Sequence, residues 1–447
     1  MVGNHHSGTL WSRTAHSRAD TYIVNRGIRT RSVSRRQIVI LCAIVAMVSL
    51  ASVTPVGAGP GGPKRCQGVQ VSPGADLQGR IANHPRRTTF CFAAGTYQLS
   101  GTVWTGDRFP RLDLRAGAVL DGQNGSFVGI TGPDAPDGQR GTVILGGVFQ
   151  HFGNANAPSW TSPLIIHRNW VVEGSEFKEN FNAGLAIHGD NARVSNVNTH
   201  HNGRYGLEVS EACAGCPGPV GVVIEDSEIA FNNTRQLAIN GDAGGTKFSG
   251  GTSGMIVRRN EVHDNYGSGL WWDGYNKNAQ VYGNAIYNNR NWGIMWELSY
   301  GGAKIHDNTL IGNGIGDGTP NFFDGVQILI SCSDGSIGGI EVYGNTIKGS
   351  AYPLGLNDHS GHPIRTRQVF VHHNVMTLRS PVTRVGAEAA DGLIELFSAA
   401  AHNRFEANTY LMPNPSGEYW AWEGQVLTWR QWRALGHDQK GAVQAIR

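Results

Sequence analysis

Asp273 and Glu297 stand at the same place in two successive copies of one sequence pattern. The first copy, "GLWWDGYNKNAQVYGNAIYNN", starts at Gly269, and the second, "GIMWELSYGGAKIHDNTLIGN", starts 24 residues later. Two carboxylates on neighbouring segments can act as the acid and the nucleophile that break a glycosidic bond. They could instead bind Ca²⁺ together with Asp242, because Ca²⁺ prefers oxygen ligands. Trp271, two residues before Asp273, would offer a flat apolar surface to a sugar ring.

The pattern occurs nine times between about Trp170 and Asn414, at intervals of 22 to 37 residues. Each unit has two or three alternating apolar residues, then a small polar residue, then another apolar residue. Alternation with a period of two indicates β-strands, and self-similarity at a regular interval indicates a solenoid. Two polar columns run through the units. The first contains Ser175, Val197, Ser227, Asn260, Asn284, Asn308, Asn345, Asn374 and Asn408, and the second, five positions on, contains Asn180, Asn202, Asn232, Asn265, Asn289 and Asn313.

A coil of about 22 residues holds three short strands, and the asparagines fall at the turns between them. We expect an asparagine ladder, in which equivalent side chains hydrogen-bond from coil to coil, about 4.8 Å apart along the axis. The repeat resembles that of the right-handed parallel β-helix proteins of the pectin-lyase-like superfamily, from about Val71 to Tyr410. This resemblance implies an all-β, single-stranded right-handed parallel β-helix.

The resemblance implies no particular reaction. Members of the superfamily include polysaccharide lyases, glycoside hydrolases, epimerases and non-catalytic adhesins. The N-T-D, G-H-G and R-I-K motifs of polygalacturonases are missing, as are the W-I-D-H of pectate lyases and the D-P-H-D of alginate epimerases. No subfamily's catalytic residues can therefore be assigned by analogy, and the chemistry must come from the site itself.

The ends of a solenoid need covers, because an open coil would expose its core and its strand edges. We expect residues 59–160 to hold an N-terminal cap and the first coils, with a helix in "ADLQGRIANH". Residues 161–412 would form the β-helix repeats. Residues 413–447 would form a C-terminal cap, in which Thr428 is the N-cap of a short helix that carries Trp429, Trp432 and Leu435 on one side.

The first 58 residues have the parts of an export signal. "TRSVSRRQ", which resembles a twin-arginine signal, precedes the apolar run "IVILCAIVAMVSLASV". We expect cleavage near Gly59 and a secreted or cell-envelope protein. The alternative is an uncleaved anchor, the one way in which this chain would contact a membrane, although the run is short for a span of about 20 residues.

The cysteines fit an oxidising compartment. We expect a Cys66–Cys91 disulfide near the mature N-terminus. Cys213 and Cys216 form a CxxC pair, which could be a redox or metal motif but is better explained as a small loop-closing disulfide. Cys332 is left over, and we expect a buried thiol.

Alignment of the strands that begin near a glycine predicts which side chains face outward. Side chains alternate along a strand, so the second and fourth positions after the glycine share the outer face. The second positions include Glu208, and the sixth include Asp242 and Tyr275. The fourth positions are His188, Ser210, Asn240, Asp273, Glu297, Leu329 and Asn357. We therefore expect Asp273 and Glu297 to be stacked on one face, with Trp271, Tyr275, His188, Glu208 and Asn240 as substrate-binding candidates.

Two classes of function fit this face. The first is an enzyme that acts on a polysaccharide, with or without uronate sugars. In a hydrolase Asp273 and Glu297 are the pair, whereas in a lyase His188 or Tyr275 would remove the C5 proton. The second is a non-catalytic protein that binds glycan or builds the envelope, in which case the polar face is only solvated surface. The net charge of +3 lies largely in the first 36 residues, which makes nucleic acid an improbable partner.

Overall fold

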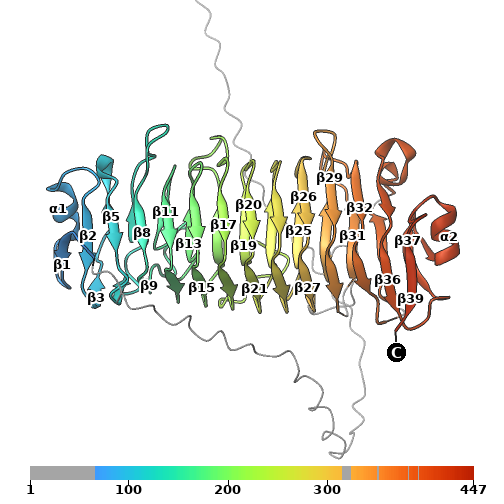
Figure 1. The fold of residues 1–447 in the computed structure, drawn as a ribbon, viewed down its shortest axis with the longest axis horizontal. Coiled ribbons are helices and arrows are strands. Elements are labelled where there is room, and N and C mark those ends of the chain that lie inside the picture. The colour runs from blue at the N-terminus through green and yellow to red at the C-terminus, as the bar shows by residue number, and fades with distance from the viewer. Residues whose placement is uncertain (1–65, 315–323, 350–351, 381, 391, 447) are drawn as a thin grey trace, which may run out of the picture. The chain divides into compact units, whose positions relative to one another are not determined.

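The computed structural model describes residues 66–314, 324–349, 352–380, 382–390 and 392–446, and these form a parallel β-helix (Figure 1). The chain visits three long sheets in turn, which we name A, B and D, and from β8 to β37 each coil adds one strand to each sheet. The expected export signal and its cleavage site lie outside the described residues. Within the described ranges, no helix is long and apolar enough to cross a membrane.

Sheet A has 13 strands. They are β1 (Val69–Val71), β2 (Thr89–Phe92), β5 (Arg111–Asp113), β8 (Val143–Leu145), β11 (Val171–Glu173), β14 (Arg193–Ser195), β17 (Val223–Glu225), β20 (Ile256–Arg258), β23 (Gln280–Tyr282), β26 (Ala303–His306), β29 (Ile340–Tyr343), β32 (Val369–His372) and β35 (Arg404–Glu406).

Sheet B also has 13 strands. They are β3 (Gly95–Gln98), β6 (Ala118–Asp121), β9 (Val148–Gln150), β12 (Glu176–Lys178), β15 (Asn198–His200), β18 (Glu228–Ala230), β21 (Glu261–His263), β24 (Ala285–Tyr287), β27 (Thr309–Ile311), β30 (Thr346–Lys348), β33 (Val375–Thr377), β36 (Thr409–Met412) and β39 (Ala442–Ala445).

Sheet D, which carries the candidate site, has 11 strands. They are β10 (Ile165–Ile166), β13 (Leu185–Ile187), β16 (Tyr205–Val209), β19 (Gly244–Ser249), β22 (Leu270–Asp273), β25 (Ile294–Glu297), β28 (Val326–Ser331), β31 (Tyr352–Asp358), β34 (Val385–Ala389), β37 (Glu418–Trp422) and β38 (Gln425–Thr428). A two-stranded sheet C pairs β4 (Val103–Trp104) with β7 (Ile130–Thr131).

The inward side chains form one continuous core along the solenoid. Branched aliphatic residues fill most inward positions, and aromatic rings fill some of the widest ones. Phe248, Trp272 and Trp296 are fully buried in three successive strands of sheet D, with ring centroids 4.7 and 5.7 Å apart. Because these inner rings stack from coil to coil, β19, β22 and β25 are held firmly from inside, and their outward side chains project from a rigid base.

Both caps contain the helices expected from the sequence. Helix α1 (Leu77–Ala82) buries Leu77 and Ile81 against the first coils. Helix α2 (Trp429–Ala434) begins at Thr428, which forms a capping box with Gln431. Three short 3₁₀ helices complete the elements, η1 (Gly106–Arg108), η2 (Glu395–Phe397) and η3 (Ala399–Ala401). The sheets extend beyond the predicted repeat limits of 161–412, because β1, β2, β3, β5, β6, β8, β9 and β39 pair in the same parallel ladders.

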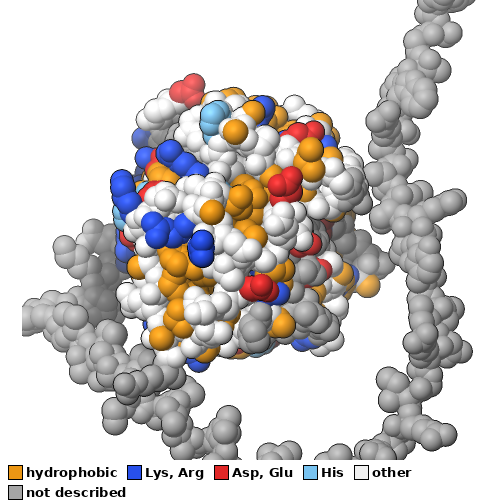
Figure 2. Space-filling view, turned by 90° about the vertical axis from the view of Figure 1, so that its right-hand side faces the viewer, with side chains coloured by type: hydrophobic (Ala, Val, Ile, Leu, Met, Phe, Trp, Pro, Cys, Tyr) orange, Lys and Arg blue, Asp and Glu red, His pale blue; other side chains and the backbone are white. Residues whose placement is uncertain are grey.

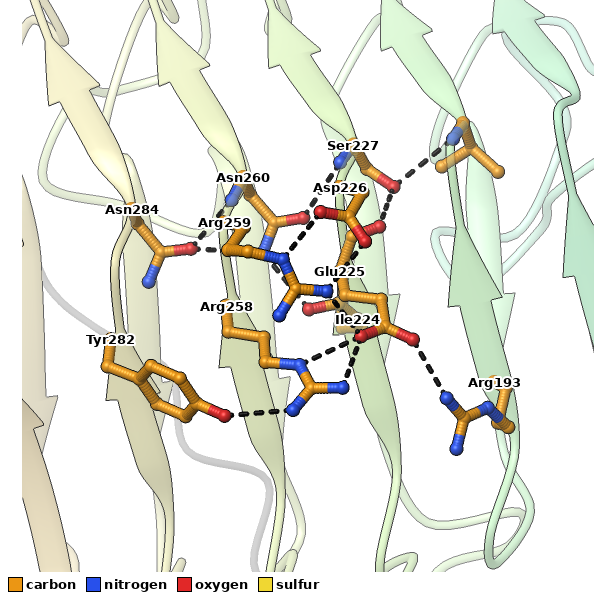
Figure 3. Close-up of polar contacts among 11 residues, drawn as sticks. Arg193, Ile224, Glu225, Asp226, Ser227, Arg258, Arg259, Asn260, Tyr282 and Asn284 are labelled. Atoms are coloured by element: carbon orange, nitrogen blue, oxygen red, sulfur yellow. Dashed lines mark hydrogen bonds and ion pairs between the residues drawn. The ribbon is translucent and has the colours of Figure 1, made fainter.

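The polar columns lie at two of the turns and are buried. Between sheets A and B, each asparagine donates its side-chain N–H to the side-chain oxygen of its equivalent in the next coil, from Asn260 to Asn408, where Asp438 accepts the last bond. The second column is joined in the same way from Asn180 to Asn313. Figure 3 shows Asn284, Asn260 and Ser227 in the first column, beside a cluster in which Glu225 accepts from Arg193 and Arg258.

The cysteine predictions agree with the structure. Cys66 and Cys91 form a disulfide that ties the segment before β1 to β2, and Cys213 and Cys216 close a short loop. Cys332 is a buried free cysteine. The CxxC pair is therefore a disulfide here rather than a metal-binding pair.

Two strand assignments on sheet D were wrong. The prediction placed Asn240 in a strand, in the segment "RQLAINGD" with Leu237 and Ile239 inward, but this segment is a loop, and the strand is β19. The reason is packing, since Phe248 of β19 fills the core against Trp272, a larger inward contact than Ile239 could make. In β28 the predicted register is shifted by two residues, because Ile328 rather than Val326 pairs with Ile294.

Candidate functional site

Asp273 and Glu297 are paired in adjacent strands. They end β22 and β25, and their Cα atoms are partners in the parallel ladder. Neighbouring strands lie about 4.8 Å apart. The expected stacking of the two carboxylates is therefore present in the fold. Asp273 is the more open of the two, with 27% of its side chain exposed against 10% for Glu297.

Each carboxylate is held beside a cation from another segment. The Lys247 ammonium, from β19, lies 2.6 Å from Asp273 Oδ2. The His359 Nε2, from the segment after β31, lies 3.9 Å from Glu297 Oε1. A side-chain hydrogen bond with Cys332, together with the Glu297 carboxylate, raises the pKa of His359 to about 10, so its ring is protonated at neutral pH. The two neighbouring carboxylates are thus flanked by one positive group on each side, and the four groups come from four segments.

The environment makes Asp273 a weaker acid than an ordinary aspartic acid. Burial raises the pKa of Asp273, and the nearby Glu297 carboxylate acts in the same direction, whereas Lys247 opposes the shift. A carboxyl with a raised pKa retains a proton more readily near neutral pH, which a proton donor requires.

Trp271 does not offer the open indole face that the sequence suggested. Its side chain points to the outer face as expected, but only 5% of the residue is exposed. The Lys247 ammonium lies 3.2 Å from the ring centroid, and the indole N–H donates to Glu297 Oε2 at 3.1 Å. It also packs against Trp292 and Met295 in a small outer cluster. Trp271 therefore orients Glu297 and Lys247 and cannot stack on a sugar in this conformation.

An exposed aromatic pair lies at the end of the same strands. Tyr275, two residues after Asp273, is 58% exposed, and its ring lies 6.0 Å from that of Tyr300 at an interplanar angle of 30°. The two rings come from successive coils and stack on each other. They supply the open aromatic surface beside the carboxylates that was expected of Trp271.

Asp242 and Asn240 lie in the loop before β19. The Lys247 ammonium bridges the Asp242 and Asp273 carboxylates, at 3.0 and 2.6 Å. It takes the place between them that a Ca²⁺ ion would need, and the described residues contain no group of three acidic, His or Cys side chains suited to a metal ion. Asn240 is exposed in the loop and does not belong to the outward column.

The outward column is more polar than predicted. Pairing along sheet D aligns Asp273 with Ser249 on one side, and Glu297 with Ser331 on the other, in place of the predicted Asn240 and Leu329. The column consists of His167, His188, Ser210, Ser249, Asp273, Glu297, Ser331, Asn357 and Glu388. Nine successive strands thus present a line of hydrogen-bonding side chains along the solenoid.

His188 directly follows β13, which is three strands away from the strand of Asp273, β22, along sheet D. Burial, followed by the nearby His167, lowers its pKa to about 4, so His188 is neutral at neutral pH. Three strand spacings amount to about 14 Å, which keeps His188 apart from the Asp273–Glu297 pair. The two histidines form a separate polar position on the same face.

Glu208 lies between these positions. It pairs with Ala186 on one side and Lys247 on the other, and its Oε2 is buried without a hydrogen-bond partner in the described part of the chain. Burial raises the pKa of Glu208 to about 7. Folding therefore favours the protonated form, and the resulting stability is present below about pH 4.5 and lost as the pH rises through about 7.

This shift predicts a pH-dependent effect of Glu208→Gln, which stays neutral at every pH. The free energy of unfolding of the variant should exceed that of the wild type by up to about 3 kcal/mol at pH 8, and by little at pH 4, because each pKa unit corresponds to about 1.4 kcal/mol. Urea titrations at a series of pH values measure the difference. Glu423→Gln, at an exposed turn, is the matched control, and an equal gain in both variants would contradict the buried carboxyl.

Comparison with known proteins supports the fold. Residues 164–363 match the family model described as a right handed beta helix region. The chain is similar to the A-module of the mannuronan C-5 epimerase AlgE4 of Azotobacter vinelandii, at 14% identity and a TM-score of 0.50, covering 82% of this chain and 92% of that one. The AlgE6 A-module of the same organism is similar at 14% identity and a TM-score of 0.46, covering 85% of this chain and 88% of that one.

The surface adhesin PfbA of Streptococcus pneumoniae is also similar, at 10% identity and a TM-score of 0.39, covering 75% of this chain and 83% of that one. No curated protein matches the sequence. The protein therefore has the fold of a right-handed parallel β-helix. The fold by itself does not assign a reaction, so the reaction has to be argued from the site.

Proposed function

We propose that this protein is an exported enzyme that hydrolyses a glycosidic bond of a polysaccharide on the outer face of sheet D. The observation that carries the proposal is the pairing of Asp273 with Glu297 at the ends of β22 and β25, each beside its own cation. The strand spacing of about 4.8 Å is close to the 5–5.5 Å between carboxyl groups that retaining glycosidases use.

The surroundings of the two carboxyls give them different roles. Asp273 has a raised pKa and the more open side chain, and it donates a proton to the glycosidic oxygen as the bond to the leaving sugar breaks. Glu297 is oriented by the Trp271 indole and attacks the anomeric carbon, forming a covalent glycosyl–enzyme. Asp273 then removes a proton from water, which displaces Glu297 and restores both groups. Lys247 stabilises the Asp273 carboxylate after it has given up its proton.

The polymer would lie along the solenoid axis. The members of the polar column that are not buried, His167, His188, Ser210, Ser249, Asp273 and Glu388, supply hydrogen-bonding groups to the sugars. Tyr275 with Tyr300 supplies an aromatic surface beside the cleavage point. Rigid strands rather than loops hold the reacting groups, which favours precise positioning.

A polysaccharide lyase is the second candidate, and a different observation favours it. The neutral His188 lies in the same outward column as Asp273, and the Tyr275 phenol is open to solvent two residues beyond it. Either could remove the C5 proton of a uronate, while Lys247 or His359 neutralises the sugar carboxylate. The distance between His188 and the two cations counts against a lyase with His188 as its base, because the base and the cation would have to act on the same sugar.

A panel of neutral and uronate-containing polysaccharides tests the proposal. Hydrolysis creates reducing ends alone, whereas a lyase creates reducing ends together with the ultraviolet absorbance of unsaturated uronates. We expect reducing ends without that absorbance. Binding without either product would make the protein a glycan-binding β-helix, and neither binding nor product on any polymer would contradict a polysaccharide partner.

Export is supported by the two disulfides, because such bonds persist in oxidising compartments. We predict that the exported protein begins near Gly59 and gains four hydrogen masses on reduction, two for each disulfide. Mass spectrometry of the intact exported protein, with and without reductant, measures both values. Recovery of the full-length chain from a membrane fraction would favour an uncleaved anchor instead.

A further inference from the structure

A basic pocket lies near the C-terminal end of the solenoid, away from the Asp273–Glu297 pair. It is a cavity of about 430 Å³ lined by Arg379, Arg384, Glu418 and Tyr419, together with Pro413 and neighbouring backbone. Arg379 and Arg384 belong to the connection between β33 and β34, and Glu418 and Tyr419 begin β37 in the next coil. Lys and Arg side chains also gather on one side of this end of the molecule (Figure 2).

The pocket belongs to the same face as the candidate site. Gly386 of β34 lies in a second line of outward positions, two residues from the polar column, that runs through Trp271, Met295, Leu329 and Gly355 and is buried. Arg384 lies two residues before Gly386, a spacing that returns a side chain to the same face of a strand. Independently, Arg384 is close enough to Tyr352 to act on its pKa, and Tyr352 packs against the outer cluster around Trp271.

The charge of the pocket defines its ligand. The lining contains two arginines and one glutamate, so positive charge is in excess there. Arginine binds carboxylate and sulfate groups through paired N–H donors. The pocket is also three strand spacings, about 14 Å, from Glu297 along the axis.

We propose that this arginine pocket is a second subsite that binds an anionic sugar, carrying a carboxylate or a sulfate ester, of the same polysaccharide chain. The inference rests on the proposed function, since it assigns the pocket to the polymer cleaved at Asp273 and Glu297. It makes the protein selective for polymers with an acidic group several sugars away from the cleaved bond. Short oligosaccharides would occupy only the cleavage site.

The test is equilibrium binding of the mature protein to size-graded oligosaccharides of three kinds: uronate, sulfated and neutral. Arg379→Glu changes an exposed side chain, and Arg384→Ala is the second variant, in case one of them disturbs folding. Arg430→Ala, on the exposed side of α2 at the same end, is the matched control. We expect at least a tenfold rise in Kd for long anionic oligosaccharides in both pocket variants, and no change for short or neutral ones or in the control. The series that loses affinity identifies the carboxylate or the sulfate as the ligand.

Three outcomes would overturn the pocket as a subsite: unchanged Kd in both pocket variants, an equal loss for neutral oligosaccharides, or no binding of long anionic oligosaccharides to the wild type. Turnover by Asp273→Asn, measured in parallel, separates the two proposals. A pocket effect on binding with undiminished turnover in Asp273→Asn would contradict the cleavage site and leave the subsite standing. Lost turnover in Asp273→Asn, with unchanged binding in both pocket variants, would support the cleavage site and contradict the subsite.

Discussion

Replacing Asp273 by Asn should lower turnover of the best polysaccharide substrate by about 10²–10⁴-fold, the usual contribution of a positioned general acid–base group. Asn has nearly the same shape but cannot donate and recover a proton at neutral pH. The fold should be unaffected, because the Asp273 pKa is already raised and the folded state gains little from its negative charge. Initial rates of reducing-end release, with the melting temperature of the same samples, measure both effects.

The control for this substitution is Asp307→Asn. Asp307 lies at an exposed turn after β26 and makes a comparable contact, a short pair with His306, but it is remote from sheet D's outer face. It has a positive φ of 53°, which Asn tolerates. Turnover in this variant should equal that of the wild type. If Asp273→Asn also keeps wild-type turnover on every active substrate, Asp273 has no part in the reaction.

Asn308→Leu should destabilise the protein by about 3–6 kcal/mol. Asn308 accepts from the backbone N–H and the side-chain N–H of Asn284, and it donates to the Val281 carbonyl and to Asn345. Leu can make none of these bonds, so at least two buried donors and one carbonyl lose their partner, and each unpaired buried group costs about 1–3 kcal/mol. Equilibrium denaturation with urea measures the change.

Asn156→Leu provides the comparison for this substitution, because Asn156 is exposed and lies outside both asparagine columns. Its effect should stay within about 0.5 kcal/mol. If Asn308→Leu were no more destabilising than Asn156→Leu, the hydrogen bonds between equivalent asparagines would not be what holds successive coils together at this turn.

The fold could be predicted from the sequence because every coil repeats the same constraint. A turn asparagine must meet its equivalent one coil away, and each strand must alternate apolar with polar side chains, so a single pattern recurs and is visible without any structure. The pairing of Asp273 with Glu297 followed from the same repeat. The Cys66–Cys91 disulfide was predicted from the expected export, and the Thr428 cap from the helix-start pattern.

Lys247 and His359 could not be predicted from the sequence, because they lie where the repeat is interrupted. Lys247 was not predicted as a site residue, because its strand, β19, was not recognised in the sequence. β19 has Thr246 at an inward position, where the pattern calls for a large apolar residue, and the preceding segment "RQLAINGD" fits the pattern better. The Lys247 ammonium covers the indole face of Trp271, which is why the prediction that this face is open to a sugar was wrong. His359 comes from a connecting segment with no periodicity, and only its proximity to Glu297 in space marks it.

The outer face is also less uniform than a list of outward residues suggests. Trp271, Met295 and Leu329 point away from the core, yet they are buried in an outer cluster with Trp292 and Val326. Alternation along a strand predicts direction and does not predict exposure, because segments from other parts of the coil can cover the outward side chains. The open aromatic surface consequently lies at Tyr275 and Tyr300, beyond the strand ends.

The central claim is that a polysaccharide binds across β22 and β25 with its glycosidic bond at Asp273 and Glu297. The most direct measurement is a crystal structure of Asp273→Asn with an oligosaccharide of the polymer that the wild type cleaves or binds. We predict sugar rings along the outer face of sheet D, with a glycosidic oxygen within hydrogen-bond distance of residue 273 and the Glu297 carboxylate beside the anomeric carbon. An oligosaccharide bound on the outer face of sheet A or sheet B, with no sugar in contact with residues 273 and 297, would contradict the account.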